Sequence, residues 1–271
     1  MNKEICVFYL FRKSDEWQKA IDFIDSYRAI ASGADHDIKI VLKGESSNKK
    51  LLGHISKLKI NYVEIPDVGR DIYSYVLLSK LFNYKFLVFL NSHSKILQED
   101  WLYMLINPFE KSSTGIVGAT GSYASHTSIA YENLNKSGLG WDLLKKIIIF
   151  YILRLLFPKF PNPHIRTNAF AIKRDAFLSL KFNMTFLKTR LGSYAAESGY
   201  KSICNQLSAK KMDSILVGLN YQVSIMDDWR SNNIFWDGGQ VKLIISDNQT
   251  RKYEKGSNSD RIFFKKIAWG T

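Results

Sequence analysis

FLVFLNSHSK, residues 86–95, is the stretch that decides the fold. Its first five residues are large and apolar, which is typical of a strand buried on both faces, and polar residues follow directly. In an α/β sheet, ligands bind in the crevice outside the carboxyl ends of the strands. A strand that becomes polar only at its carboxyl end therefore brings those side chains to such a crevice. We expect a ligand site there that includes Asn91, Ser92, His93 and Lys95.

The residues before this stretch alternate between strand and helix patterns. Strands are predicted at residues 4–11, 37–44, 61–67 and 85–93, and helices at residues 16–30, 49–58 and 71–82. This alternation predicts βαβ units and a mostly parallel sheet with helices on both faces, which is an α/β fold. Because right-handed crossovers bring the carboxyl ends of parallel strands to one edge, four segments should meet there: residues 11–13, 43–44, 67–71 and 91–95.

The carboxyl-terminal half has a less regular pattern. Residues 114–123 predict a short glycine-rich strand, and residues 164–177 predict a strand that leads into a helix. Between them, residues 141–163 contain an apolar run, Ile147 to Leu153, that is far shorter than a membrane span. Two interpretations of this segment stay open: a buried helix, or a short interfacial helix or loop with basic flanks. No proline- or glycine-rich linker divides the chain, so we expect a single domain over residues 1–271.

The positive charge of the chain is unevenly distributed. The net charge is +13, and residues 143–190 contain ten Lys or Arg but one acid, Asp175. This asymmetry favours an anionic partner, which is a nucleic acid, an anionic membrane surface or a phosphorylated substrate. Solvated lysines on an ordinary basic protein give the same count, so the charge alone does not choose between these interpretations.

Composition and cysteine usage are those of a folded intracellular protein. Apolar residues make up 46% of the chain and aromatic residues 14%, as in a globular domain. Cys6 and Cys204 lie in apolar or helical contexts without metal-ligand spacing, so we expect them to be buried and reduced. The opening residues, MNKEICVFYL, predict a strand instead of a signal peptide, and a cytoplasmic location is expected.

DVGRD, residues 67–71, follows the third predicted strand directly. Gly69 permits a tight turn and a close approach of a ligand to the backbone. Arg70 offers a fork of hydrogen-bond donors that suits a phosphate, and Asp71 stands at a helix start, where it either caps the helix or binds a hydroxyl. Because this turn belongs to the same sheet edge as residues 91–95, we expect both segments to contribute to one site.

GRDI (residues 69–72), followed by a helix and an apolar strand that ends in HSK (residues 93–95), resembles the rhamnan-synthesis type of bacterial glycosyltransferases. HIRTNAFAIKRDAF, AAESGY and SDNQTRKYE also resemble segments of bacterial polysaccharide glycosyltransferases. The resemblance implies a GT-A-like fold, with a nucleotide-sugar-binding half at residues 1–100 and an acceptor-binding half at residues 101–271. It also implies sugar transfer from a UDP- or dTDP-linked donor to a growing surface polysaccharide or its polyprenyl-diphosphate-linked precursor.

This resemblance places the donor at the shared edge, with contacts from Phe11, Asp67, Gly69, Arg70, Asp71, Asn91, Ser92 and Lys95. GT-A enzymes usually end the fourth strand with two aspartates that hold a divalent metal against the leaving diphosphate, whereas this chain has Asn91 and His93. Three interpretations stay open. In the first, His93 ligates Mn²⁺ or Mg²⁺. In the second, which we favour, His93, Lys95 and Arg70 stabilise the phosphates without a metal. In the third, the strand end has no direct role.

An inverting transfer needs a general base for the acceptor hydroxyl. Glu197 in YAAESGY is the first candidate, because it stands among small residues near a predicted helix start, and Asp227 and Asp228 in MDDWR are the second. An acid of the first helical turn, favoured by the helix dipole, explains the same pattern. Acceptor contacts are expected from polar, acidic and aromatic residues of the second half: His164, Arg166, Asn168, Asp228, Trp229 and Trp236. The two tryptophans either stack on sugar rings or belong to the core.

Two other functions stay open. A basic chain rich in aromatic residues fits a nucleic-acid-binding protein, but no zinc-ligand spacing, RNP-like strand or basic heptad region supports it. A catalytically inactive sugar-nucleotide-binding scaffold is the other, because the usual aspartate pair is missing. No P-loop motif occurs, and no GxGxxG follows the first strand. We expect a glycosyltransferase at the cytoplasmic face of a bacterial membrane, held to anionic lipid by residues 143–190, with no nucleic-acid partner.

Overall fold

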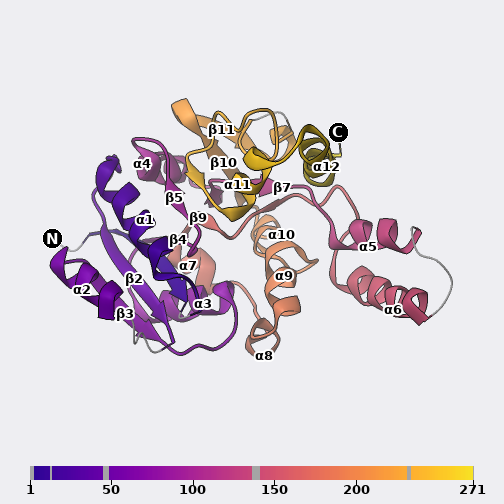
Figure 1. Cartoon of the computed structure of the whole chain (residues 1–271), viewed down its shortest axis with the longest axis horizontal. Coiled ribbons are helices and arrows are strands. Elements are labelled where there is room, and N and C mark those ends of the chain that lie inside the picture. Colours follow the sequence, from indigo (N-terminus) through magenta and orange to yellow (C-terminus); the bar gives the residue numbers. More distant parts are fainter. Residues whose placement is uncertain (1–2, 13, 45–48, 136–140, 231–232, 271) are drawn as a thin grey trace.

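One eight-stranded sheet forms the centre of the chain (Figure 1). The computed structural model describes residues 3–12, 14–44, 49–135, 141–230 and 233–270. The strands lie in the order β11-β10-β6-β9-β4-β1-β2-β3. Their bounds are Ile5–Arg12 for β1, Asp37–Lys43 for β2, Asn61–Ile65 for β3, Phe86–Leu90 for β4, Thr114–Gly118 for β6, Ala169–Lys173 for β9, Asp213–Gly218 for β10 and Gln222–Ile225 for β11.

Most of the strands run in one direction. β3, β2, β1 and β4 are parallel neighbours, and β6 and β10 share their direction. β9 and β11 are antiparallel to the strands beside them. The expected α/β class with a mostly parallel sheet is therefore confirmed, and the sheet combines strands from both halves of the chain.

Helices cover both faces of the sheet, and a separate hydrophobic core lies under each layer. On β1, Phe8 and Leu10 belong to one core and Tyr9 and Phe11 to the other, because successive side chains of a strand point to opposite faces. One layer contains α1 (Trp17–Ala29), α2 (Lys49–Lys57) and α4 (Trp101–Ile106). The other contains α3 (Asp71–Leu81), α7 (Arg174–Leu178), α9 (Arg190–Ser198) and α10 (Ile203–Ser208).

Two small sheets connect distant segments to the carboxyl-terminal part. β5 (Lys95–Ile96) pairs with β12 (Ile245–Ser246), and β7 (Gly121–Ser122) pairs with β8 (His164–Ile165). After β12 the chain forms α11 (Asn248–Lys255) and α12 (Asn258–Trp269), and each of these helices begins with a capping box. Residues 247–251 are thus the N-cap and the first turn of α11.

The helical hairpin formed by α5 (His126–Asn135) and α6 (Trp141–Leu156) extends away from the sheet (Figure 1). Of the two interpretations of this segment, the buried helix is wrong. Residues 141–156 are helical, but the helix exposes a set of large apolar side chains: Leu144, Ile148, Ile149, Tyr151, Ile152 and Leu155. Among the described helices, none is long and apolar enough to cross a membrane.

The elements predicted for the first ninety residues are confirmed, with small shifts at their ends. β4 stops at Leu90, because Asn91 begins a turn. Cys6 and Cys204 are buried and unpaired, as expected. The predicted helix start near Glu197 is wrong: α9 begins at Arg190, where Thr189 caps it by accepting a hydrogen bond from the Gly192 N–H at 2.9 Å.

Two glycines in helices should respond oppositely to alanine. A Cβ at position 192 would lie 1.9 Å from the Phe186 carbonyl oxygen, whereas a Cβ at the exposed position 53 of α2 has nothing within 4 Å. We predict that Gly192→Ala lowers the free energy of unfolding by about 1–3 kcal/mol through overpacking. Gly53→Ala should raise it by about 0.5–1 kcal/mol through helix propensity. Urea unfolding followed by circular dichroism measures both, and effects of the same sign would contradict this packing.

Candidate active site

A polar pocket of about 540 Å³ lies at the carboxyl edge of the parallel strands. The ends of β1 and β4 and the turn after β3 reach it, together with one face of α9. Its lining residues are Arg12, Arg70, Asp71, His93, Thr167, Arg190, Ser193, Tyr194, Glu197 and Asn248. The structure therefore brings together four residues that the sequence predicts for the site: Arg70, Asp71, His93 and Glu197.

The start of α3 is joined to the end of β1 by an ion pair between Arg12 and Asp71. Burial opposes the charge of the Arg12 guanidinium, but the neighbouring Asp71 carboxylate raises its pKa above the ordinary value. These two charges offset each other within the pocket wall. The cations on the exposed rim are Arg70 and Arg190.

Lys43 lies under the turn that carries Arg70. Its side chain is buried, and Nζ donates hydrogen bonds to the carbonyl oxygens of Gly69 at 2.5 Å and Arg70 at 3.4 Å. Burial, followed by the charge of Arg12, lowers the pKa of Lys43 to about 8. Gly69 has φ +71°, and a Cβ there would lie 2.7 Å from Tyr73, so the turn requires glycine. Lys43 thus holds the turn in place instead of facing a ligand.

Most polar groups of the turn after β4 form hydrogen bonds that stabilise the turn itself. The Asn91 side-chain oxygen accepts hydrogen bonds from the His93 N–H at 3.1 Å and the Ser94 hydroxyl at 3.3 Å. Ser92 is buried, and its carbonyl oxygen accepts a hydrogen bond from the Tyr9 hydroxyl at 3.0 Å. Asn91 and Ser92 therefore stabilise the turn, and His93 is the side chain of this turn that lines the pocket.

His93 is half-buried at the pocket. Burial, and then the charge of Lys19, lowers its pKa below the ordinary value, so its imidazole is neutral at pH 7. The backbone carbonyl of His93 accepts a hydrogen bond from Arg251 of α11 at 3.0 Å. His93 can therefore offer a substrate one N–H donor.

Glu197 belongs to the polar face of α9. Four pocket residues stand at spacings of 3, 4 and 7 along this helix, which puts them on one side: Arg190, Ser193, Tyr194 and Glu197. Oε2 of Glu197 accepts hydrogen bonds from the Thr167 N–H at 2.9 Å and from the Thr167 hydroxyl. The carboxylate is therefore held at a fixed place in the pocket wall.

Arg166 makes a buried ion pair instead of facing a phosphate. Its Nη2 lies 2.7 Å from Oδ2 of Asp247, and the two side chains are 14% and 1% exposed. Its guanidinium also lies 4.1 Å from the ring centre of Phe235 and donates to the Thr120 hydroxyl at 3.2 Å. Burial opposes ionisation of Asp247, but Arg166 and the N–H groups of Thr250 and Gln249 keep its pKa below the ordinary value.

The other predicted residues of the acceptor half lie outside the pocket lining. His164 and Asn168 are buried; His164 Nδ1 bonds the Asn162 carbonyl oxygen at 2.7 Å, and Asn168 accepts from the Thr120 hydroxyl at 2.8 Å. Burial lowers the pKa of His164, so it is a neutral core residue. These placements differ from the prediction because the apolar run of β9 draws the preceding residues into the interior.

The two predicted tryptophans belong to packed regions. Trp229 is fully buried and donates to the Ser224 carbonyl oxygen at 3.0 Å, which leaves no exposed face for a sugar. Trp236 is half-buried, stacks on Phe235 with ring centres 4.6 Å apart, and donates to the Gln249 carbonyl oxygen at 3.0 Å. The other predicted contacts outside the pocket lining are Phe11, which is buried in the core, and the exposed Asp67, Lys95 and Asp228.

The residues of the pocket do not fit the aspartate-pair metal site of GT-A enzymes. Asn91 uses its side-chain oxygen within the turn, Asp71 pairs with Arg12, and Glu197 is bonded by Thr167. Within the described ranges, no group of three or more His, Cys, Asp or Glu side chains is arranged to hold a metal ion. His93 as a metal ligand would therefore lack carboxylate partners.

Four lining residues were missed by the sequence prediction, namely Arg190, Ser193, Tyr194 and Asn248, whereas Arg12 and Thr167 lie in segments that the sequence predicted for a site. Arg12 stands at the end of an apolar strand, as the polar residues after β4 do, so the sequence indicates its position at the sheet edge. The polar residues of RLGSYAAES recur at helical spacing, which also was a usable signal. Asn248 reaches the pocket through the pairing of β5 with β12, which no local pattern indicates.

No known protein family matches the sequence, and no curated protein shows significant similarity to it. Among solved structures, the chain is similar to a mannosyltransferase, PcManGT from Pyrobaculum calidifontis, in complex with GDP-Man and Mn²⁺. The identity is 10% and the TM-score 0.42, over 65% of this chain and 46% of that one. It is also similar to GalNAc-T7 with UDP, GalNAc and Mn²⁺, at 14% identity and a TM-score of 0.46, over 69% of this chain and 38% of that one.

A third similar structure is glucosyl-3-phosphoglycerate synthase from Mycobacterium tuberculosis, in complex with Mn²⁺, UDP and phosphoglyceric acid. The identity is 14% and the TM-score 0.40, over 66% of this chain and 59% of that one. The matches thus cover about half of the length of these structures. At such TM-scores, the likenesses say nothing about what this chain binds or transfers.

The buried ion pair can be tested by a substitution that keeps the helix cap. Asp247→Asn retains an oxygen for the first N–H groups of α11 but leaves Arg166 as an unpaired buried charge. We predict a loss of about 3–5 kcal/mol in the free energy of unfolding at pH 7. The control Glu4→Gln removes an exposed pair with Lys85 and should cost about 1 kcal/mol or less.

The pH dependence of this difference has a defined sign. Because the folded pKa of Asp247 is below that of the unfolded chain, its contribution is complete above about pH 4 and is lost as the pH falls through the folded pKa. Urea unfolding at several pH values should show the stability gap between wild type and Asp247→Asn closing in acid. A gap that is small at pH 7, or that widens in acid, would contradict the ion pair.

Proposed function

We propose that this chain is a glycosyltransferase that moves a sugar from a UDP- or dTDP-linked donor to a hydroxyl group of an acceptor. One observation carries the proposal: the same pocket contains two cations on its rim, Arg70 and Arg190, and a carboxylate, Glu197, that Thr167 holds in place. The two cations suit the binding of a diphosphate, and the carboxylate suits the deprotonation of a hydroxyl group. The position of the pocket at the carboxyl edge of a mostly parallel sheet supports a ligand site.

Departure of the nucleoside diphosphate builds negative charge on its phosphate oxygens. Guanidinium groups stay charged at all working pH values and bind phosphate oxygens bidentately. In the proposed mechanism, Arg70 and Arg190 stabilise the leaving group, and neutral His93 donates one hydrogen bond to it. Lys43 contributes indirectly, since it holds the turn that presents Arg70. No step is assigned to a metal ion.

Glu197 acts as the general base in this proposal. It accepts the proton of the acceptor hydroxyl while the hydroxyl oxygen attacks the anomeric carbon from the side opposite the diphosphate, which inverts the configuration. Both hydrogen bonds from Thr167 reach Oε2 of Glu197, so we assign Oε1 to the acceptor. The bond between the anomeric carbon and the phosphate oxygen breaks, and the diphosphate leaves with that electron pair.

The acceptor that we propose is a growing bacterial surface polysaccharide, such as an O-antigen or capsule chain, or its polyprenyl-diphosphate-linked precursor. This places the reaction at the inner face of the plasma membrane. The support is the sequence resemblance of residues 69–72 and 93–95, together with exposed cations between residues 143 and 190 that include Lys145, Arg154 and Lys159.

A donor screen tests the proposal directly. UDP-, dTDP- and GDP-linked sugars are offered with a polyprenyl-diphosphate acceptor, with and without EDTA, and the anomeric configuration of the product is assigned by NMR. Transfer from one donor class with inversion is the expected result. Failure of every nucleoside diphosphate to raise the melting temperature at millimolar concentration would overturn the proposal.

We predict that Glu197→Gln lowers kcat about 10²–10⁴-fold, because an amide cannot accept the hydroxyl proton. The nucleotide should bind as before, since the phosphate-binding cations are unchanged. The control Glu64→Gln alters an exposed carboxylate on β3 and should leave kcat unchanged. Initial rates of nucleotide release and isothermal titration with UDP give the two readouts. Unchanged turnover in Glu197→Gln would remove it from the mechanism.

We also predict that Arg70→Gln and Arg190→Gln each weaken UDP binding by about tenfold or more, because each removes a charge-assisted hydrogen bond to phosphate. Arg28→Gln, at an exposed position of α1, is the matched control. Titration calorimetry with and without EDTA measures these affinities. If EDTA abolishes UDP binding to the wild type, cationic side chains alone do not hold the diphosphate.

A further inference from the structure

α6 carries a continuous apolar stripe on its exposed side. The stripe consists of Leu144, Ile148, Tyr151, Ile152 and Leu155, which are 44% to 80% exposed. At 100° per residue these positions fall within an arc of about 100°, and the stripe is roughly 16 Å long. Solitary apolar residues on a surface are ordinary, but a contiguous set of this size marks an interaction site.

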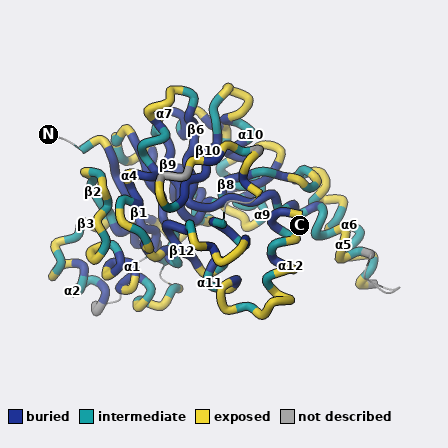
Figure 2. Tube along the Cα trace, turned by 90° about the horizontal axis from the view of Figure 1, so that it is seen from above, coloured by how far each residue is buried: buried dark blue, intermediate teal, exposed yellow. Residues whose placement is uncertain are grey.

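The stripe is exposed because the opposite side of α6 is already packed on α5. Phe150 packs on Tyr131 with ring centres 5.8 Å apart. The Thr127 hydroxyl donates hydrogen bonds to the carbonyl oxygens of Leu153 at 3.1 Å and Phe157 at 2.8 Å, which anchors the end of α6. Exposed positions alternate with partly buried ones along this hairpin, which stands apart from the buried centre of the molecule (Figure 2).

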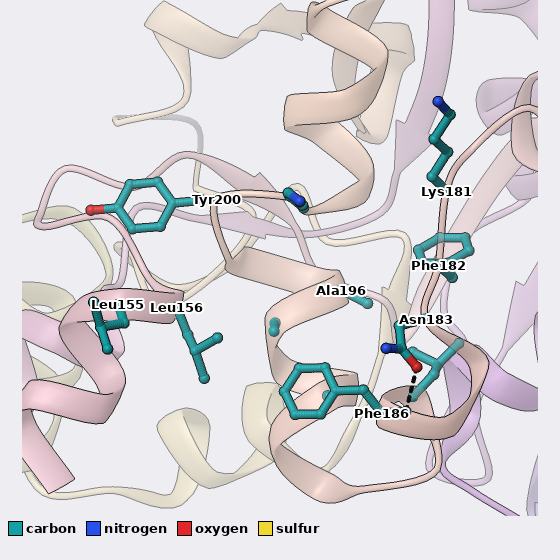
Figure 3. A pocket seen from close by; sticks show the side chains of 12 residues that line it. Leu155, Leu156, Lys181, Phe182, Asn183, Phe186, Ala196 and Tyr200 are labelled. Carbon is teal, nitrogen blue, oxygen red and sulfur yellow. Dashed lines mark hydrogen bonds between the residues drawn. The ribbon is translucent and has the colours of Figure 1, made fainter.

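An apolar groove continues the stripe. Leu155 belongs to the stripe and also lines this groove, whose volume is about 390 Å³, within the range of ligand pockets. Leu155 and Leu156 of α6 form one wall, and Phe182 and Phe186 lie across from them (Figure 3). Lys181 and Lys201 line the groove as well and are exposed. The groove thus combines an apolar interior with two cations.

The groove and the candidate active site share α9. Gly192, Ala195 and Ala196 face the groove, whereas Glu197 and Ser193 face the polar pocket. At 100° per residue, the centres of these two sets lie about 130° apart around the helix axis. One helix therefore separates an apolar surface from the pocket that carries the proposed chemistry.

Charge decides between the possible occupants of this surface. Lys145 and Arg154 are exposed on either side of the stripe, and Lys159 is exposed just beyond α6. A second copy of the chain would bring the same cations against each other, which is unfavourable. A bilayer with anionic headgroups complements both the cations and the apolar stripe, as it does for amphipathic helices that lie in a membrane interface.

We propose that the α6 stripe and the adjoining groove form one membrane-docking surface for an anionic bilayer. The stripe inserts among the lipid chains at the interface, the flanking cations contact headgroups, and the groove takes a chain of one lipid whose phosphate meets Lys181 and Lys201. This inference rests on the proposed function in one respect, which is that the reaction takes place at a membrane. Its experiment measures lipid binding with no sugar donor present, so failed docking and failed transfer are told apart.

The test is sedimentation of the full chain with vesicles of phosphatidylglycerol and phosphatidylcholine, compared with vesicles of phosphatidylcholine alone. We expect binding to the anionic vesicles, and a loss of at least tenfold in the double variant Ile148→Gln/Ile152→Gln. The control Leu81→Gln/Ile262→Gln changes apolar residues that are 63% and 68% exposed on α3 and α12, and it should bind like the wild type. Melting temperatures confirm that each variant is folded.

A separate binding experiment tests the groove. Dodecyl phosphate serves as a single-chain anionic probe in titration calorimetry, and inorganic phosphate as the control. Ala195→Trp, which fills the groove, and Lys181→Gln/Lys201→Gln, which removes its cations, should each weaken dodecyl phosphate at least tenfold. Equal binding by wild type and Ile148→Gln/Ile152→Gln on anionic vesicles would overturn the proposal. So would a wild-type dimer in sedimentation equilibrium that this double variant converts to a monomer.

Discussion

The buried ion pair between Arg166 and Asp247 is the interaction on which the geometry of the candidate site depends. Arg166 directly precedes Thr167, whose N–H and hydroxyl hold the Glu197 carboxylate. Asp247 caps α11, and Arg251 of the same helix holds the backbone carbonyl of His93. A single pair therefore positions the two predicted catalytic residues, although they come from different halves of the chain.

The ion pair contributes more to fixing the relative orientation of the two segments than to the free energy of unfolding. A buried pair adds little net stability, because the cost of removing both charges from water offsets their attraction. Apolar residues of similar volume would pack well, but they would leave the rotation of neighbouring segments less defined. Here the guanidinium has Thr120 and the Phe235 ring as further partners, and Asp247 accepts from two N–H groups of α11. These further partners fix the direction of both charged groups.

The parts of the fold that were predictable depend on local patterns. Strand and helix periodicity, together with the handedness of βαβ crossovers, suffices to bring Arg70, Asp71 and His93 to one edge. The role of Arg166 was not predictable, because a guanidinium suits a phosphate and a carboxylate equally. Its partner, Asp247, arrives through the antiparallel pairing of β12 with β5, which is a contact between distant segments. Glu197 was identified correctly as a pocket residue, but its place in the helix was misjudged because Thr189 was not recognised as the cap.

α9 lies between the pocket of the proposed chemistry and the groove of the proposed membrane-docking surface. Its polar side presents Glu197, and its other side consists of small residues that permit close packing against α8 (Met184–Leu187), as the clash of a Cβ at Gly192 shows. A helix with its side chains is about 10–12 Å across, and this thickness separates the carboxylate from the apolar groove. If the lipid whose chain lies in the groove is the proposed lipid-linked acceptor, its hydroxyl must reach past this helix to Glu197. A diphosphate and one or more sugars between chain and hydroxyl supply that reach, whereas the headgroup of a simple phospholipid does not. Under the two proposals, α9 therefore favours acceptors in which a spacer separates the lipid chain from the reactive hydroxyl.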